Sequence, residues 1–300
     1  MTKPLDKPPI VVAAIQLNSQ QDIDANLVAI SAAVAEASAK GAKLIVLPEN
    51  TCSMGQQRET AQRFDELSAY MADLAKQHQV HLVAGTLPCL NRPDGSSVAQ
   101  GRLRQVSQVF GPTGSLLARY DKIHLFTATV NDEHSSYNEA ATFEPGTQTV
   151  TALLDIDGHC YPLGLMVCFD LRFPALAQRL RQAGAELLCA PSAFTYLTGK
   201  AHWRLLLQAR ALDSQCLVIG AAQGGSHRYP QGPSRQTWGH AAIMAHDGSC
   251  MSEYEHSDLA GAQNRHKTQP PFATVLATFD PKAQREARAN LPIFDCHRLA

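Results

Sequence analysis

Hydrophobic positions along the chain follow two spacings, one typical of strands and one typical of helices. Short apolar runs rich in Val, Ile and Leu predict strands at 10–17, 43–50, 81–85, 104–110, 115–125, 161–167, 185–192, 216–223, 240–249 and 272–279. Between many of these runs, apolar residues recur every three or four positions and predict helices at 25–40, 63–79, 175–183 and 201–214. Gly41 ends the first of these helices, and the sequence GPTG at 111–114 predicts a turn between two paired strands.

The alternation of strands and helices predicts an α/β protein built from layered sheets. Several strands are apolar on both faces, which indicates that helices cover one side of a sheet and a second sheet covers the other. Polar stretches at 127–146, 224–239 and 256–271 are interpreted as long surface loops beside a site rather than as linkers. We therefore expect one domain spanning residues 1–300, because the candidate chemistry draws on residues from both halves.

The composition is ordinary for a globular protein, with 45% hydrophobic and 18% charged residues in a chain of 300. The formal net charge is -1, and no basic stripe indicates a nucleic-acid partner. The opening MTKPLDKPPI lacks the apolar core of a signal peptide, and no apolar run reaches membrane-spanning length. These features predict a soluble, cytoplasmic protein whose partner is a small molecule rather than a nucleic acid or a membrane.

Eight cysteines are present, but no CxxC pair indicates a structural zinc site. A chain of this length also has enough core residues to fold without disulfides. Most of the cysteines lie in apolar runs, such as ELLCAPS and SQCLVIG, and are interpreted as small buried hydrophobic residues. Cys168 differs from them, because a predicted buried strand runs directly into it and a charged turn ending in proline follows.

Three predicted strand ends each carry a titratable side chain: Glu49 in LIVLPEN, Lys122 in RYDKIHL and Cys168 in GLMVCFDLRFP. Ligand sites in layered α/β proteins form beyond strand ends, where loops converge. A nearby ammonium favours the thiolate of a cysteine and stabilises a tetrahedral oxyanion, while a glutamate takes the thiol proton and returns it to the leaving nitrogen. With a backbone N–H in the turn after Cys168, these groups would make an acyl-transfer site whose thiol stands on a sharp bend.

Each of these residues also has an ordinary structural interpretation. A glutamate after proline is commonly a surface carboxylate or a helix cap, and a single lysine is commonly solvated. A metal site has less support, because Asp132, Glu133, His134 and Glu139 lack the HxxxH or HxH spacing of transition-metal ligands. The glycine-rich GAAQGGSH also lacks the spacing of a phosphate-binding loop. We therefore expect neither a metal nor a nucleotide.

Three segments, LPEN, YDKIHLF and GLMVCFDLRFPAL, resemble in this order the signature segments of the nitrilase superfamily of carbon–nitrogen hydrolases. The resemblance covers nearly the whole chain and implies a four-layer αββα sandwich, a Glu–Lys–Cys triad and no cofactor. It assigns the general base to Glu49, the oxyanion-stabilising lysine to Lys122 and the nucleophile to Cys168. A further glutamate precedes a Pro-Gly pair in many members, and YNEAATFEPG offers Glu139 for that role, with Glu144 as a competitor. The family also implies a homodimer or a larger even homo-oligomer.

Later segments resemble the Nit-type branch of this superfamily, which hydrolyses deaminated glutathione: AHWRLLLQARALDSQCLVIGAAQGGSH, WGHAAIMAHDGS and REARANLPIFDCHR. We expect this metabolite-repair reaction, with a cysteine thioester and release of ammonia. The alternatives are an omega-amidase acting on 2-oxoglutaramate or 2-oxosuccinamate, or another amidohydrolase of the superfamily. Two other classes stay open, a non-catalytic oligomeric scaffold and an acyl or amide transferase that uses the same thioester.

Four further residues are candidates for substrate binding: Phe169, Arg172, His202 and Trp203. Asp170 and Arg172 are first of all candidates for holding the turn after the nucleophile, through backbone hydrogen bonds or a mutual ion pair. Arg172 could instead grip a substrate carboxylate with both arms of its guanidinium. His202 and Trp203 begin a predicted helix, where they either line the pocket or only pack against the helix start.

Overall fold

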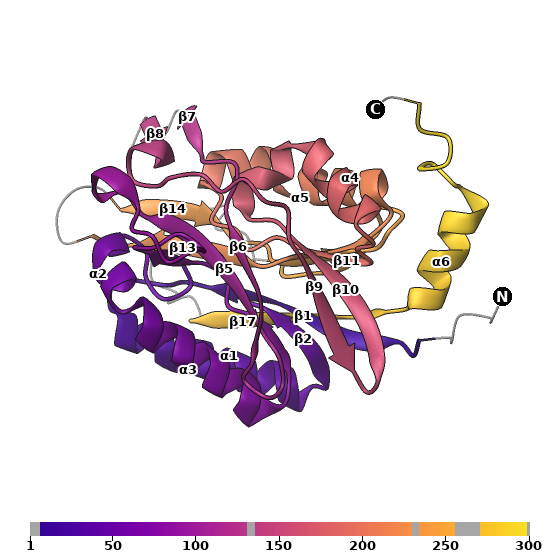
Figure 1. Ribbon diagram of the computed structural model, residues 1–300, viewed down its shortest axis with the longest axis horizontal. Helices are drawn as coiled ribbons and strands as arrows, with labels where there is room; N and C mark the ends of the chain where they lie inside the picture. The colour runs from indigo at the N-terminus through magenta and orange to yellow at the C-terminus, as the bar shows by residue number, and fades with distance from the viewer. Residues whose placement is uncertain (1–6, 131–135, 230–233, 256–270, 299–300) are drawn as a thin grey trace.

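A computed structural model of the chain describes residues 7–130, 136–229, 234–255 and 271–298. Two β-sheets pack face to face, and helices cover both outer faces (Figure 1). On the first sheet lie α1 (Ile23–Ala39) and α3 (Phe64–His78), and on the second lie α4 (Pro174–Gln182) and α5 (Tyr196–Ser214). The four-layer αββα sandwich expected from the sequence is confirmed.

The first sheet is mixed. Its described strands run in the order β14 (Arg235–Trp238), β13 (Ala222–His227), β1 (Ile10–Leu17), β2 (Ala42–Val46), β3 (His81–Val83), β5 (Arg104–Phe110) and β4 (Leu87–Cys89), with β17 (Phe272–Phe279) paired to β1 and β6 (Leu116–Asp121) paired to β5. β1 is parallel to β2, whereas β17 is antiparallel and pairs with β1 along its whole length. The last described strand therefore lies beside the first.

The second sheet is shorter and includes the strand that leads to Cys168. Its described strands run in the order β16 (Cys250–Glu253), β15 (Ala242–Met244), β12 (Leu217–Gly220), β11 (Leu187–Cys189), β10 (His159–Leu165) and β9 (Thr151–Ile156). A separate pair joins β7 (Thr127–Thr129) to β8 (Ser136–Asn138). The stretch at 127–146, predicted as a loop, thus contains a small hairpin in its described part.

Helix boundaries follow local signals, but two helices were not predicted and a third begins earlier than predicted. Asp22 caps α1 by accepting a hydrogen bond from the Ala25 N–H, and Asp280 caps α6 (Pro281–Asn290) in the same way. The short α2 (Gln57–Gln62) and α6 are not predicted by the hydrophobic pattern. α5 begins at Tyr196 rather than at position 201, so it includes Gly199. This glycine packs closely against Trp238, since a Cβ on it would lie 2.2 Å from the Cβ of Trp238. The glycine lets the first turns of α5 approach β14.

The predicted strand at 216–223 is two strands that belong to different sheets. β12 ends at Gly220 and β13 begins at Ala222, so the chain crosses from the second sheet to the first at Ala221. Ala221 is fully buried, and its carbonyl accepts a hydrogen bond from the Ser192 N–H at 2.9 Å. An apolar run cannot distinguish one long buried strand from two short ones. The stretch at 224–239 was also predicted as a loop, whereas its described part completes β13 and contains β14.

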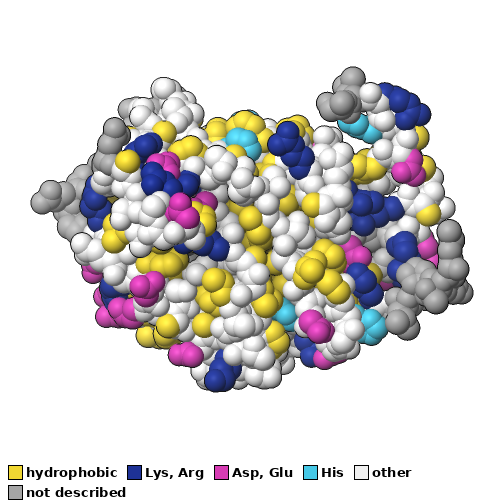
Figure 2. Space-filling view, viewed as in Figure 1, with side chains coloured by type: hydrophobic (Ala, Val, Ile, Leu, Met, Phe, Trp, Pro, Cys, Tyr) yellow, Lys and Arg dark blue, Asp and Glu magenta, His cyan; other side chains and the backbone are white. Residues whose placement is uncertain are grey.

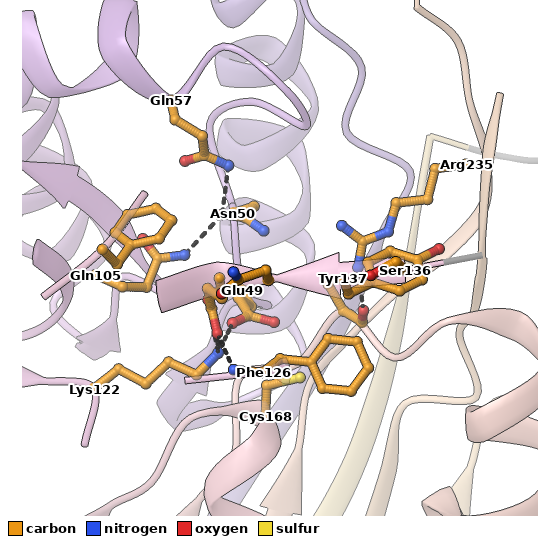
Figure 3. A pocket seen from close by; sticks show the side chains of 14 residues that line it. Glu49, Asn50, Gln57, Gln105, Lys122, Phe126, Ser136, Tyr137, Cys168 and Arg235 are labelled. Carbon is orange, nitrogen blue, oxygen red and sulfur yellow. Dashed lines mark hydrogen bonds and ion pairs between the residues drawn. The ribbon is translucent and has the colours of Figure 1, made fainter. Parts of the chain in front are cut away.

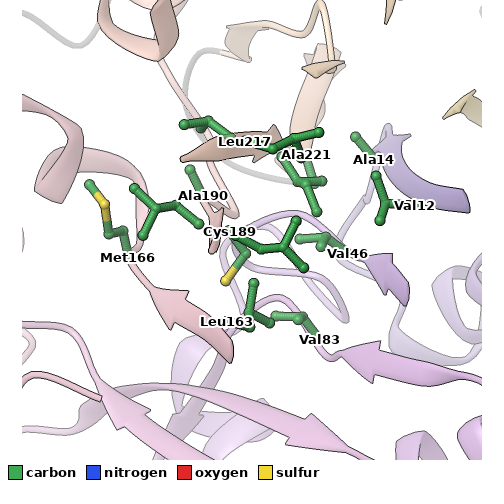
Figure 4. Close-up of a cluster of buried hydrophobic side chains, with 14 of the residues drawn as sticks. Val12, Ala14, Val46, Val83, Leu163, Met166, Cys189, Ala190, Leu217 and Ala221 are labelled. Atoms are coloured by element: carbon green, nitrogen blue, oxygen red, sulfur yellow. The ribbon is translucent and has the colours of Figure 1, made fainter. Parts of the chain in front are cut away.

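Alternate residues of β1 face different layers. Val12 and Ala14 belong to the cluster between the two sheets, whereas Ala13 and Ile15 pack beneath the helices of the first sheet. Figure 4 shows side chains of both sheets meeting in the first of these clusters. A strand in this position is buried on both faces, which explains why its sequence is apolar at every position except Gln16.

Charged side chains of both signs lie close together over the visible face, and neither sign forms an extended region there (Figure 2). Within the described residues, no helix combines the length and the apolar character that a membrane crossing requires. The predicted loop at 256–271 falls outside the described residues, apart from Pro271, whose carbonyl accepts a hydrogen bond from the Asn18 N–H at 3.1 Å. The single domain and the even oligomer stay predictions.

Candidate active site

Three chain segments bring acidic and basic side chains together at strand ends. Lys122 follows β6 directly, Glu49 lies three residues after β2, and Glu139 follows β8. The Nζ atom of Lys122 lies 2.8 Å from Glu49 Oε1 and 2.8 Å from Glu139 Oε2. These three residues and Cys168 line one cavity of about 270 Å³ (Figure 3). The four residues predicted as catalytic therefore lie in one site.

Cys168 has a backbone conformation that few residues other than glycine adopt. It is the first residue of the 3₁₀ helix η3 (Cys168–Arg172), and its φ of 48° lies in the left-handed region. Its N–H donates a hydrogen bond to the carbonyl of Pro191 at 2.9 Å, which fixes the turn against the segment after β11. The residue is 8% exposed, and that exposure is to the cavity. The sharp bend predicted at this thiol is present.

Burial and neighbouring charges determine which groups of the cavity carry protons. Burial raises the pKa of Cys168 well above its ordinary value, the Glu49 carboxylate raises it further, and Lys122 offsets only part of the rise. The predicted effect of Lys122 on the thiol thus has the right sign but is outweighed. Burial alone would lower the pKa of Lys122, but Glu139 and Glu49 overcome it and hold that pKa well above its ordinary value. The site therefore contains a fixed ammonium and a thiol beside a carboxylate.

Glu139, and not its competitor Glu144, contacts Lys122. Glu139 begins the 3₁₀ helix η2 (Glu139–Ala141), and its Oε2 atom also accepts a hydrogen bond from the Phe126 N–H at 2.6 Å. Glu144 instead forms ion pairs with two arginines, Arg92 at 2.7 Å and Arg104 at 3.2 Å. The geometry favours the choice of Glu139 made from sequence spacing.

Asp170 connects the segment that carries Lys122 to the turn that carries Cys168. Its carboxylate is fully buried and accepts four hydrogen bonds of 2.7 to 3.1 Å. The donors are the Tyr120 hydroxyl, the Val167 N–H, and the backbone N–H and Nδ1 of His124. We assign the proton of the His124 ring to Nδ1, because an ionised carboxylate can only accept. Asp170 therefore holds the turn through backbone and side-chain hydrogen bonds, as predicted.

Arg172 does not form the predicted ion pair with Asp170. Its guanidinium lies over the rings of Phe169 and Phe194, 5.9 Å and 5.5 Å from their centroids, and 3.3 Å from Nδ1 of His202. Asp170 has its bonding capacity filled by other donors, which leaves Arg172 to stack on aromatic faces. Arg172 is also absent from the cavity wall.

The remaining predicted binding residues lie behind or away from the cavity. Phe169 packs edge-on against Phe126 at 5.2 Å between centroids, and Phe126 is the ring that lines the cavity. His202 is exposed on α5. Trp203 is only 1% exposed, and its Nε1–H donates to the carbonyl of His240 at 2.6 Å. Because α5 begins at Tyr196, Trp203 lies about two turns into the helix on its buried face. Of the two alternatives given for Trp203, it packs within the fold and does not line the cavity.

The cavity wall includes polar residues that were not predicted, among them Asn50, Gln57, Gln105 and Arg235. Asn50 Oδ1 accepts hydrogen bonds from the side-chain amides of Gln105 at 2.8 Å and Gln57 at 3.3 Å (Figure 3). The position of Asn50 directly after Glu49 was the available signal for it. Gln57 and Arg235 lie in elements that the hydrophobic pattern did not predict, so nothing in the sequence singled them out.

No group of three or more His, Cys, Asp or Glu side chains in the described ranges is arranged to hold a metal ion. The acidic run at 132–134, considered above for metal binding, falls in a part of the chain that the structure does not describe. All eight cysteines are free in the structure.

Comparison with known proteins identifies the family to which this arrangement belongs. The family model named carbon-nitrogen hydrolase matches residues 11–263. The chain belongs to the carbon–nitrogen hydrolase family. This assignment confirms the resemblance to the nitrilase superfamily that the three sequence segments indicated.

Curated relatives of this carbon–nitrogen hydrolase match along almost its whole length. It is 36% identical over 295 residues to the deaminated glutathione amidase of Synechocystis, which covers 97% of this chain and 98% of the relative. It is 31% identical over 287 residues to the omega-amidase NIT2 of Homo sapiens, which covers 94% of this chain and 93% of the relative. The hydrolase also superposes on the crystal structure of the C. elegans NitFhit protein with a TM-score of 0.79 and 26% identity, covering 98% of this chain and 66% of that longer one.

Proposed function

We propose that the chain is an amidase that hydrolyses deaminated glutathione through a thioester on Cys168. The observation that carries the proposal is the position of the Lys122 ammonium, 2.8 Å from both Glu49 and Glu139, in the cavity that Cys168 also lines. A nucleophile, a base and a fixed cation in one enclosed site are the groups that acyl transfer from an amide requires.

In the first half-reaction, Cys168 gives its proton to Glu49 while its sulfur attacks the amide carbon. The base acts at the moment of attack, because burial keeps the free sulfur protonated. Lys122 stabilises the oxyanion, and we assign the second donor to the Phe169 N–H because that of Cys168 already donates to Pro191. Glu49 then passes the proton to the leaving nitrogen, the C–N bond breaks, and the acyl group stays on sulfur as a thioester.

In the second half-reaction, Glu49 takes a proton from water, and the resulting hydroxide attacks the thioester carbon. The C–S bond breaks, the carboxylic acid leaves, and the sulfur recovers its proton from Glu49. Glu139 transfers no proton in this scheme. It accepts hydrogen bonds from Lys122 and from the Phe126 N–H, so its role is to hold the ammonium at the oxyanion.

The choice of substrate rests on the names of the relatives and on the chemistry of the leaving group. The relative that is 36% identical is named for deaminated glutathione, and the one that is 31% identical is named an omega-amidase. In deaminated glutathione the amide nitrogen belongs to a cysteinylglycine dipeptide, so hydrolysis releases that dipeptide and 2-oxoglutarate. The expected release of ammonia is therefore wrong for this substrate, and it applies only to an unsubstituted amide such as 2-oxoglutaramate.

The test uses 2-oxoglutarate, the product that both amides share. Purified protein is given deaminated glutathione or 2-oxoglutaramate, and kcat/KM is measured for each from 2-oxoglutarate release. We expect the higher value for deaminated glutathione. A higher value for 2-oxoglutaramate would make the protein an omega-amidase, and no product from either amide would overturn the proposal.

Two cysteine variants test the thioester. Cys168→Ala is expected to lower kcat by about a thousand-fold or more, because the nucleophile is lost. Cys189→Ala is the matched control, since Cys189 is fully buried on β11, has a pKa raised by burial to about 12, and does not line the cavity. Rapid quenching followed by mass spectrometry should detect the acyl adduct on Cys168 in the parent protein and in Cys189→Ala, but not in Cys168→Ala.

A further inference from the structure

One cationic side chain in the cavity wall has no acidic partner among the residues that the structure describes. Arg235, at the start of β14, donates one hydrogen bond to the carbonyl of Ala193 at 3.0 Å and lies 5.5 Å from the ring centroid of Tyr137. It forms no ion pair with any Asp or Glu in the part of the chain that the structure describes. Its Nε atom is buried and has no hydrogen-bond acceptor. The guanidinium therefore has donor capacity left over at the wall of the site.

Other arginines with a buried Nε show how this protein normally compensates such a charge. Of the four other arginines in the described residues with a buried Nε that has no acceptor, three form ion pairs with carboxylates: Arg102 with Glu144, Arg104 with Asp121 and Arg210 with Asp213. The fourth, Arg181, lies over the ring of Phe294 and does not line the cavity. A guanidinium cannot lose its proton to escape burial, so it needs an anion or several acceptors. Arg235 has instead a single carbonyl and an aromatic face. A ligand bound in the cavity could supply the acceptor that Arg235 lacks.

The charges of the cavity are separated in space. Lys122 is occupied by two carboxylates, and Arg235 comes from the other side of the cavity, as Figure 3 shows. A substrate carboxylate placed near Glu49 and Glu139 would be repelled by them, whereas one placed at Arg235 would meet a planar donor fork of matching shape. An anionic amide would thus be oriented by charge before any bond changes.

We propose that Arg235 binds a carboxylate of the substrate, which makes the site selective for amides that carry a negative charge. The inference rests on the proposed function, because both candidate substrates contain such a carboxylate. It also moves the carboxylate contact away from Arg172, the residue suggested by the sequence. Arg172 stacks over Phe169 and Phe194 and does not line the cavity.

The experiment measures binding rather than turnover. In a Cys168→Ala background, which cannot form the thioester, calorimetry compares glutaramate, an amide with one carboxylate, with glutaramide, its neutral diamide of the same length. We expect glutaramate to bind more tightly than glutaramide. Arg235→Gln should weaken glutaramate by about 10- to 100-fold, the usual loss when a charged hydrogen-bonding group is removed, and leave glutaramide unchanged. The affinity of Arg235→Lys for the anionic ligand should lie between those of the parent and Arg235→Gln, because lysine retains the charge but lacks the planar pair of guanidinium donors.

Two further variants complete the design. Arg228→Gln makes the same charge change at an exposed position at the end of the same hairpin, and it should leave both affinities unchanged. Arg172→Gln tests the alternative residue and should not reduce the preference for glutaramate. The inference is overturned if glutaramate does not bind, if Arg235→Gln leaves its affinity unchanged or weakens both ligands equally, or if only Arg172→Gln removes the preference. These results do not depend on whether the intact protein hydrolyses deaminated glutathione, so failure of the proposed function is seen separately.

Discussion

Three carboxylates, of which Glu49 and Asp170 are buried and Glu139 is half-buried, are compensated in different ways. Glu49 and Glu139 line the cavity and share the ammonium of Lys122. Asp170 does not line the cavity, is fully buried, and has four hydrogen-bond donors supplied by the protein itself. Burial alone therefore does not distinguish a reacting group from a supporting one. The distinction lies in whether the carboxylate still has a lone pair facing space that a substrate can enter.

The same distinction applies to the cysteines. Burial raises the pKa of Cys52 and of Cys189 to about 12, and it also raises the pKa of Cys168. Cys168 alone among these three faces the cavity, with Glu49 and Lys122 close enough to change its pKa. A raised thiol pKa is thus a general result of the fold, and reactivity requires the neighbouring base as well.

Among changes at the two sets of carboxylates, Lys122→Met should have the largest effect, because it removes the cation that Glu49 and Glu139 share. We expect kcat to fall by at least about 100- to 1000-fold through loss of oxyanion stabilisation. The free energy of unfolding should also fall by about 3 to 5 kcal/mol, since Glu49 and Glu139 would face each other without compensation. Steady-state kinetics and urea unfolding measure the two effects. Lys43→Met, which removes an exposed lysine 3.6 Å from Asp157, is the control and should change neither quantity much.

Asp170→Asn should have a smaller effect that falls mainly on structure. The amide would place an N–H₂ group against donors such as the Val167 N–H, which lowers the free energy of unfolding by about 1 to 3 kcal/mol. Because the turn of Cys168 loses its anchor, kcat should fall while KM changes little. Tyr120→Phe removes a single donor and should lower stability by about 1 kcal/mol. An Asp170→Asn protein with normal stability and normal kcat would contradict the supporting role.

His227 provides a third buried titratable group, outside both carboxylate clusters. Burial lowers its pKa to about 4, and its Nδ1–H donates to the Ser19 carbonyl at 2.6 Å. As the pH falls, the unfolded chain takes up the proton that charges the imidazole at a higher pH than the folded protein does. The stability present above pH 6.5 is therefore lost as the pH falls toward 4, by about 3 kcal/mol. Urea unfolding between pH 7 and pH 4 should show a shallower fall for His227→Gln than for the parent. Equal slopes in the two proteins would contradict the buried neutral histidine.

His202→Ala and Trp203→Phe should have the smallest effects on activity. His202 is exposed, and its Nδ1 atom lies 3.3 Å from the guanidinium of Arg172. Loss of the His202 side chain should therefore change the free energy of unfolding by less than about 0.5 kcal/mol. Trp203→Phe removes the hydrogen bond to His240 and should lower stability by about 1 kcal/mol with KM unchanged. A large rise of KM in either variant would show that His202 or Trp203 contributes to substrate binding after all.

The sequence was informative where chemistry coincided with a strand end. Glu49 and Cys168 each follow a recognisable apolar run, and Lys122 lies toward the end of the strand predicted at 115–125, so their approach to one another could be expected from the sequence. The resemblance to a known family then ordered them into roles. Glu139 could be chosen over Glu144 only from its spacing to the Pro-Gly pair.

The sequence was uninformative where the chain changes direction inside an apolar or polar run. Ala221 lies within eight residues that predict one strand, although the chain passes there from one sheet to the other. Arg235 lies in a stretch that was interpreted as a loop but contains β14. The predicted helix began at position 201 because Gly199 is a poor helix former, although α5 begins at Tyr196 and Trp203 therefore lies further along it. These features depend on which surfaces come into contact, and local periodicity carries no information about such contacts.

The pairing of β17 with β1 has a consequence for how the protein is made. β1 is synthesised before the other described strands, yet all eight of its residues pair with β17, a strand that is synthesised after position 271. Until β17 has been added, this central strand therefore has an exposed edge, which calls for shielding from other nascent chains. Although every group proposed to act in catalysis has been added by position 169, the enzyme should become active only after residues 272–279 have been added.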